Sequence, residues 1–215
     1  MYPIYAIFER IVWLFIFIST RFFGSFNLIG RENIKNLPRP LMIIANHQTF
    51  FDPVIIGTVF PFFSKYIPIA FMVDDRYYHN PFLKIFFKLT YTFPAHYGQG
   101  LDVSLKEPRR VLRDRGVFLI FPSGERHLGG PAPRPRRGAA VLALETPNLT
   151  ILPVWLKIVK RKITVVIGQS FKLREITSSH DISEVALALS AEIFKLENRA
   201  QFAFLKTSTV PEKES

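Results

Sequence analysis

Cysteine is absent from the 215-residue sequence. Disulfide bridges, thiolate metal ligands and a cysteine nucleophile are therefore excluded. The chain also lacks a long apolar run, because the longest uninterrupted one, Ile11 to Ser19, is too short for a membrane span of ~20 residues. The histidines show no close spacing typical of metal ligands, so we expect no metal site; they are His47, His79, His96, His127 and His180.

Apolar residues and positive charge are abundant. Apolar residues make up 48% of the chain, with 22 phenylalanines, which excludes a disordered protein and favours one folded domain. Basic residues outnumber acidic ones by 28 to 17, so the formal net charge is +11. A charge of this size predicts an anionic partner, and nucleic acid and an anionic membrane surface are the two candidates.

The opening segment favours the membrane. Residues 3–24 are mostly apolar, and their only charged residues are Glu9, Arg10 and Arg21. A helix here, with arginines reaching toward the headgroups, suits a half-immersed position in the membrane surface. A core helix buried on every side and a single membrane span are the alternatives. We predict a membrane-associating helix over residues 1–25 and, from the basic surface, a position at the cytoplasmic face of the inner or plasma membrane.

Strand-like and helix-like segments alternate along the rest of the chain. "LMIIA" and "VFLIF" are continuous apolar runs, typical of strands buried on both faces. The pattern predicts one α/β domain over residues 26–205, with a mostly parallel sheet flanked by helices, a hairpin of the last two strands, and a disordered tail over 206–215. Strands are expected at 26–30, 41–45, 66–73, 91–95, 117–121, 149–158 and 162–171, and helices at 51–63, 80–89, 101–116, 137–146 and 183–204.

Two loops that follow apolar strands contain the chemically suggestive residues. The first, "ANHQTFFDP", places His47 five residues before Asp52. A carboxylate that accepts the imidazole N–H can fix the tautomer of a histidine base. The alternative is structural: Asp52 only caps the following helix, and His47 is an ordinary loop histidine. Because ligands bind beyond the carboxyl ends of parallel strands, we expect the two loops to share one site.

The second loop, "FPSGERH", suits an anionic ligand. Ser123 and Gly124 expose backbone N–H groups, and the Arg126 guanidinium can bind a phosphate in a forked geometry. Ser123 is a poor candidate for a hydrolase nucleophile, because Phe121 and Pro122 occupy space where a nucleophile elbow needs small residues. Except for Arg126, most basic residues of this region are expected to form a solvated surface; the set is Lys106, Arg109, Arg110, Arg113, Arg115, Arg126, Arg134, Arg136 and Arg137.

Over roughly residues 27–170 these stretches resemble, in order, the glycerophospholipid acyltransferase family, typified by 1-acylglycerol-3-phosphate O-acyltransferases. "NHQTFFD" matches its H-x-x-x-x-D block, "FPSGER" stands where the family has F-P-E-G-T-R, and "RRGAAVLALETPNLTILPVW" resembles the later blocks. The resemblance implies acyl transfer from acyl-CoA or acyl carrier protein to a lysolipid hydroxyl, with no cofactor. It also implies His47 as the general base, Asp52 as the carboxylate that orients it, and Arg126 as a ligand of the acceptor phosphate.

Two blocks depart from the family's pattern. Ser123 replaces its glutamate and Glu125 its threonine, and His96 stands where the second block has an arginine. The first candidate acceptor is 1-acylglycerol-3-phosphate; another lysolipid, an alcohol or an amine, and an inactive lipid-binding homologue, are the alternatives. The expected partners are anionic membrane lipids and the thioester donor, and not nucleic acid, for which no binding motif is present. The candidate substrate-binding residues are Asn46, Thr49, His96, Ser123, Gly124, Glu125 and Arg126.

Overall fold

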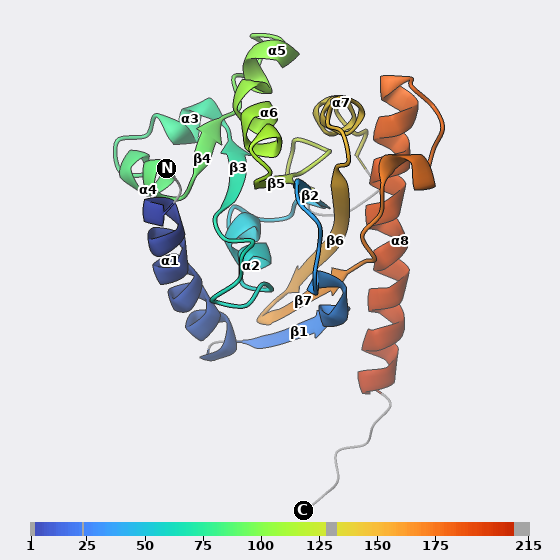
Figure 1. Cartoon of the computed structure of the whole chain (residues 1–215). Coiled ribbons are helices and arrows are strands. Elements are labelled where there is room, and N and C mark those ends of the chain that lie inside the picture. The colour runs from blue at the N-terminus through green and yellow to red at the C-terminus, as the bar shows by residue number, and fades with distance from the viewer. Residues whose placement is uncertain (1–2, 23, 128–132, 209–215) are drawn as a thin grey trace, which may run out of the picture.

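The computed structural model describes residues 3–22, 24–127 and 133–208 (Figure 1). At its centre is a seven-stranded sheet with the order β1-β7-β6-β2-β5-β3-β4. All neighbouring strands are parallel except the β6–β7 hairpin, as the sequence predicted. The strands are β1 (Ser25–Ile29), β2 (Leu41–Ala45), β3 (Ile69–Val73), β4 (Thr92–Pro94), β5 (Val117–Ile120), β6 (Thr150–Val159) and β7 (Lys162–Ile167).

Helices cover both faces of the sheet, which confirms the predicted α/β class. They are α1 (Pro3–Phe22), α2 (Asp52–Gly57), α3 (Asp75–Tyr78), α4 (Lys84–Leu89), α5 (Leu101–Ser104), α6 (Lys106–Arg113), α7 (Gly138–Glu145) and α8 (Ile182–Ser208), with 3-10 turns at Arg31–Ile34 and Leu173–Glu175. Successive residues of β2 point to opposite faces, so Met42 and Ile44 join the core under α6, α7 and α8, while Leu41 and Ile43 join the core under α2. Every residue of β2 and β5 is buried, as their continuous apolar sequences predicted.

Two predicted helices are interrupted because of proline. The helix predicted over residues 51–63 is observed only over Asp52–Gly57, since a helix cannot continue through Pro61. The helix predicted over residues 101–116 is divided into α5 and α6. Pro108 is tolerated in the first turn of a helix, where its missing N–H is not needed, so α6 starts anew two residues before it.

The remaining differences from the prediction are three short elements that were not predicted and the ends of several longer ones. The short helix α3 and the two 3-10 turns gave no recognisable signal in the sequence. The elements β3, β7 and α4 are each shorter than predicted. Helix α8 continues through Ser208, so the first three residues of the segment predicted as a disordered tail are helical. The rest of that segment lies outside the described residues.

Helix α1 packs along one flank of the sheet, against α2, α4 and β1, and α8 lies along the other (Figure 1). On the inner face of α1, Glu9 Oε2 accepts from the N–H of Ile69 at 2.9 Å. Arg10 Nε and Trp13 Nε1 each donate to a backbone carbonyl of the segment after α2, both at 3.0 Å. The Arg10 guanidinium thus helps to fasten α1 to the domain, and the reach of the arginines of this helix toward lipid headgroups stays a prediction.

The opposite face of α1 is apolar and exposed, so the alternative of a helix buried on every side is also wrong. Its exposed residues recur at three- and four-residue spacings and form one stripe along the helix. Ring contacts of α1 with Phe86 of α4 and with Phe62 place further exposed side chains nearby. Among the described residues, no helix is long and apolar enough to cross a membrane. We define the apolar face as Ile4, Ile7, Ile11, Leu14, Phe15, Ile18, Phe22, Phe63, Phe82 and Ile85.

The burial of the Glu9 carboxyl should lower the stability of the fold at neutral pH, and this effect can be measured. Burial raises the pKa of its carboxyl well above the usual range, although the Ile69 N–H and Arg10 act in the opposite direction. Its second oxygen, Oε1, is buried without a hydrogen-bond partner in the described part of the chain. We expect Glu9→Gln to raise the free energy of unfolding at pH 7 by about 1 kcal/mol, because an amide keeps the acceptor and buries no charge.

The dependence on pH follows from the same raised pKa, since the folded chain holds this proton more tightly than the unfolded chain. The stabilisation from Glu9 is complete below the unfolded carboxyl pKa of about 4.3 and is lost as the pH rises toward the folded value. Urea unfolding between acid and neutral pH should therefore show a smaller loss of stability in Glu9→Gln than in the wild type. The exposed Glu32→Gln serves as the control. Equal pH slopes for Glu9→Gln and the wild type would show that Glu9 is not buried as described.

Candidate active site

The two candidate loops meet at the carboxyl ends of β2 and β5, which are neighbours in the sheet. His47 follows β2, and its ring stacks on Phe121, directly after β5, with 4.1 Å between centroids and 13° between planes. The backbone N–H of His127 donates to the His47 carbonyl at 2.7 Å. The structure therefore brings together the loops that the sequence assigned to one site.

Asp52 is fully buried at the start of α2 and takes its hydrogen bonds from the His47 loop. Its Oδ2 lies 2.8 Å from His47 Nδ1 and accepts from the backbone N–H groups of Gln48 at 2.5 Å and Thr49 at 2.9 Å. Its Oδ1 accepts from the Thr49 hydroxyl at 2.5 Å. Pro53 suits the first turn of a helix, so the chain turns here and directs the carboxylate back over the loop. These donors offset the hydration that a buried carboxylate loses.

The donors around Asp52 fix the tautomer of His47. Backbone N–H groups only donate, and Oδ2 already accepts from two of them, so it serves as the acceptor of this cluster. The 2.8 Å contact with His47 is therefore donated by its Nδ1–H. In the neutral ring the lone pair is then on Nε2, for which the described residues provide no hydrogen-bond partner. A histidine in this state can accept a proton from a substrate hydroxyl.

The expectation that Asp52 caps α2 is wrong. Phe51 holds the N-cap position, and no side chain makes a capping hydrogen bond there. The Asp52 carboxylate instead serves residues 47–49, which precede the helix. The side chain of His47 is 18% exposed, so it can be reached from the surface while its partner is sealed from water.

Asn46 and Gln48 extend the pairing of β2 with β6 beyond the end of β2. Asn46 Nδ2 donates to the carbonyl of Leu156, and its Oδ1 accepts from the N–H of the same residue, both at 2.7 Å. Gln48 Oε1 accepts from the N–H of Ile158 at 3.0 Å. Of the predicted substrate-binding residues, Asn46 is therefore occupied with β6 and Thr49 with Asp52.

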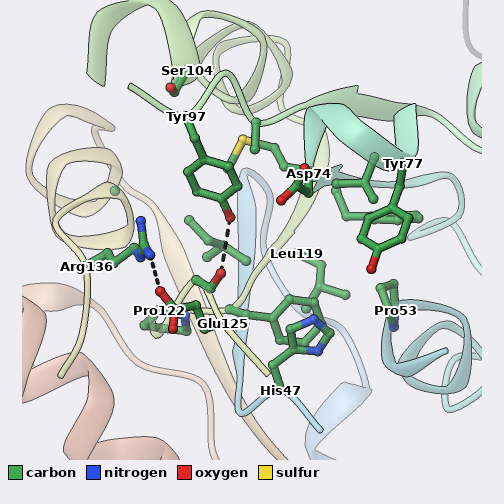
Figure 2. Close-up of a pocket in the computed structure, with 18 of the residues that line it drawn as sticks. His47, Pro53, Asp74, Tyr77, Tyr97, Ser104, Leu119, Pro122, Glu125 and Arg136 are labelled. Carbon is green, nitrogen blue, oxygen red and sulfur yellow. Dashed lines mark hydrogen bonds and ion pairs between the residues drawn. The ribbon is translucent and has the colours of Figure 1, made fainter. Parts of the chain in front are cut away.

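A cavity of about 600 Å³ opens beside His47 (Figure 2). Its inner wall is apolar and includes Phe50, Phe71, Met72, Phe87, Leu105 and Leu119. An apolar chamber with a few polar groups at its rim is typical of a small-molecule binding site. The described residues include no group of three or more histidines, cysteines, aspartates or glutamates placed to hold a metal ion. Charged and phenolic side chains stand at the more exposed rim, namely Asp74, Arg76, Tyr77, Tyr97, Glu125, Arg126, Arg136 and Arg137.

The "FPSGER" loop is locked by contacts that the sequence did not reveal. The Arg136 guanidinium forms an ion pair with Glu125 and lies over the ring of Tyr97, 5.2 Å from its centroid. The Tyr97 hydroxyl donates to the carbonyl of Gly124 at 3.1 Å (Figure 2). Gly124 has a φ of +66°, and a Cβ there would lie 2.5 Å from the Arg136 side chain, so glycine suits this position. Ser123 donates its hydroxyl to the carbonyl of Glu125 at 2.9 Å, which tightens the turn.

The remaining predicted residues divide into those at the cavity and those away from it. Gly124, Glu125 and Arg126 line the cavity. Ser123 and His96 are not among its lining residues. The backbone of His96 is left-handed, with φ 45°, and its Nδ1 lies 3.6 Å from an oxygen of Asp75. His96 therefore occupies the place of the second-block arginine in the sequence but faces a carboxylate in the structure.

Several residues of the rim gave no recognisable signal in the sequence, and Arg136 was expected to form part of a solvated surface. Arg76 donates two hydrogen bonds to Asp74, at 3.0 and 2.8 Å, and so lowers the pKa of that carboxyl. Burial raises the pKa of Tyr97, although Arg136 lowers it, so the hydroxyl remains a neutral donor. These residues follow β3, β4 and β5 and meet only because those strands are neighbours, so no short motif marks them.

A mostly parallel sheet flanked by helices, with a hydrogen-bonded histidine–aspartate pair beside an apolar cavity, defines an α/β protein with a candidate active site at the carboxyl ends of its strands. The family model described as Acyltransferase matches residues 25–157, and the chain belongs to this family. A similar solved structure is that of the 1-acyl-sn-glycerophosphate (LPA) acyltransferase PlsC from Thermotoga maritima, with a TM-score of 0.68 and 18% identity over 89% of this chain and 79% of that one. This similarity shows a shared fold. A comparison with curated proteins gives no match.

The two hydrogen bonds of Asn46 predict a structural role that can be measured. We expect Asn46→Ala to lower the free energy of unfolding by about 1–3 kcal/mol, because the N–H and carbonyl of Leu156 would lose their partners. Urea denaturation measures the change, with the exposed Gln99→Ala as a control that should stay within about 0.5 kcal/mol of the wild type. Weaker substrate binding at unchanged stability would show instead that Asn46 contacts the substrate.

Proposed function

We propose that this acyltransferase moves a fatty acyl group from an acyl thioester, acyl-CoA or acyl carrier protein, to the free hydroxyl of a lysophospholipid. The first candidate acceptor is 1-acylglycerol-3-phosphate. The observation that carries the proposal is the His47–Asp52 pair beside a cavity with an apolar interior and a basic rim. Membership of the acyltransferase family supports the reaction, and the substrate named for the structurally similar PlsC supports the acceptor by analogy.

In the proposed reaction, Nε2 of His47 takes the proton from the acceptor hydroxyl as its oxygen attacks the thioester carbonyl. A C–O bond forms, the C–S bond breaks, and the leaving sulfur receives the proton from the imidazolium. The products are an ester and a free thiol, and no cofactor is needed beyond the thioester donor. Asp52 holds the ring in place and stabilises the imidazolium between the two proton transfers.

The cavity suits an acceptor with one acyl chain and one anionic headgroup. Its apolar wall can take the chain, and the guanidinium groups of its rim, including Arg126, can take the phosphate. A lysolipid with another headgroup is the second candidate acceptor. It is favoured by the replacement of two residues of the family's blocks by Ser123 and His96.

We also propose that the apolar face docks on an anionic membrane, with residues 1–25 as the main contact. Phe15, Phe63 and Phe82 are 69%, 88% and 90% exposed, and large apolar patches of this kind mark interaction surfaces. Helix α4 contributes Ile85 to the apolar face and Phe86 to the wall of the cavity, so the two surfaces adjoin at this helix. The net charge of +11 favours the anionic cytoplasmic leaflet of the inner or plasma membrane.

Acyl transfer from labelled acyl-CoA and acyl carrier protein to a panel of lysolipids tests the proposed reaction. We expect His47→Ala to lower turnover by about 10²–10⁴-fold, because the general base is lost. Asp52→Asn should lower it to a similar extent, since an amide can keep the hydrogen bonds but cannot stabilise the imidazolium. The exposed His180→Ala is the matched control and should retain activity.

Two outcomes of this assay would count against the proposal. Absence of transfer to every acceptor by the folded wild type would mean that the chain binds lipids without acylating them. Loss of folding in both His47→Ala and Asp52→Asn would make the pair structural. Preference for an acceptor without a phosphate monoester would keep the acyltransferase and replace 1-acylglycerol-3-phosphate as its substrate.

Membrane docking can be tested on the exposed stripe of α1. We expect the double variant Phe15→Glu, Ile18→Glu to reduce sedimentation with anionic phospholipid vesicles at least about tenfold, because burying either new charge in the membrane is costly. Leu187→Glu is the control: this residue is 58% exposed but belongs to α8, on the opposite flank. Circular dichroism checks that each variant folds. Undiminished binding of the double variant would show that the apolar face does not contact the membrane.

A further inference from the structure

Four arginines line the cavity, and two of them are already neutralised by carboxylates of the protein. Arg76 donates two hydrogen bonds to Asp74, and Arg136 forms its ion pair with Glu125. Arg136 is held further by its position over Tyr97. A ligand that bound either guanidinium would have to share it with a carboxylate that already neutralises its charge.

The other two arginines, Arg126 and Arg137, have no carboxylate partner among the described residues. Arg126 donates to the Tyr77 hydroxyl at a long distance, 3.4 Å. Arg137 immediately precedes α7 and makes no side-chain capping bond there. Both are exposed, and they reach the cavity from two different segments, the "FPSGER" loop and the start of α7. The excess positive charge of the rim is therefore concentrated on these two groups.

The second block does not supply the cation that the family's pattern leads one to expect. His96 stands at that position, lies 3.6 Å from Asp75 and is not part of the cavity lining. Arg137 lies outside that block and lines the cavity. An arginine is well suited to the task, because its planar fork matches the geometry of two phosphate oxygens.

We propose that Arg137 and Arg126 together bind the phosphate of the acceptor, and that Arg137 provides the cation that the second block lacks. This inference rests on the proposed function and adds a specificity-determining residue to it. Its neighbour Arg136 has a different task, which is to hold the "FPSGER" loop through Glu125 and Tyr97. Two consecutive arginines thus differ in function because only one of them has a partner within the protein.

Kinetics with two acceptors test the assignment in the full-length protein. With 1-acylglycerol-3-phosphate, we expect Arg137→Ala to raise KM about tenfold or more while kcat changes less than about threefold, because the residue contacts the phosphate and not the reacting atoms. Arg137→Lys should fall in between, since it keeps the charge and loses the fork. With a monoacylglycerol, which has no phosphate, Arg137→Ala should leave KM unchanged. Arg134→Ala is the control from the same basic segment, because Arg134 is exposed and does not line the cavity.

Equilibrium binding separates failure of this inference from failure of the proposed reaction. Calorimetry with a soluble short-chain 1-acylglycerol-3-phosphate, on chains that also contain His47→Ala, measures binding without turnover. We expect Arg137→Ala to weaken binding about tenfold and Arg134→Ala to leave it unchanged. Inorganic phosphate should compete only weakly; competition as strong as that of the lysolipid would overturn the assignment to a lipid headgroup.

The possible results of these experiments distinguish the role of Arg137 from the proposed reaction. Transfer to the phosphate-bearing acceptor with the same KM in Arg137→Ala and wild type would overturn the inference and leave the reaction standing. Binding that depends on Arg137, without any transfer by the wild type, would support the anion site and contradict the reaction. An equal loss of affinity in Arg134→Ala and Arg137→Ala would also overturn the inference, because it would reflect general surface charge.

Discussion

A carboxylate removed from water must find hydrogen-bond donors, and Asp52 finds them in the three residues of the preceding loop. The bonds that offset the cost of its burial also orient His47 and place the lone pair of the neutral ring on Nε2. Asn46 and Gln48 fasten the same loop to the backbone of β6. The position of His47 is therefore set by the sheet, and the orientation of its ring depends on the packing that buries Asp52.

The cavity beside the His47–Asp52 pair has an apolar inner wall and a charged rim. Buried and partly buried side chains of β3, α4 and β5 make the inner wall of the cavity apolar, and α4 also contacts α1, which carries most of the apolar face. The rim is basic, but its ion pairs leave only part of that charge available to a ligand. A lipid whose chain enters the wall and whose headgroup stays at the rim fits this division, with its hydroxyl near His47.

The sheet and the central pair could be predicted from the sequence because both depend on local patterns. Continuous apolar runs marked β2 and β5, and the loops after parallel neighbours necessarily lie at one edge of the sheet. The predicted helix lengths were wrong where Pro61 and Pro108 overrode the apolar periodicity. The contacts of the rim could not be predicted for another reason: Tyr97 and Arg136 meet only because of the strand order. In addition, Arg136 and Arg137 are alike in the sequence, but only Arg136 has a carboxylate within reach.

The central claim is that Asp52 holds His47 with the proton on Nδ1 and the lone pair on Nε2. Nitrogen-15 NMR of histidine-labelled protein measures this directly, because protonated and unprotonated ring nitrogens have well-separated shifts. We expect the neutral His47 ring to have a protonated Nδ1 and an unprotonated Nε2, and its Nδ1–H proton to couple through the hydrogen bond to Asp52. A neutral ring protonated on Nε2 would contradict the account, because the nitrogen available to a substrate would then be a donor and not a base.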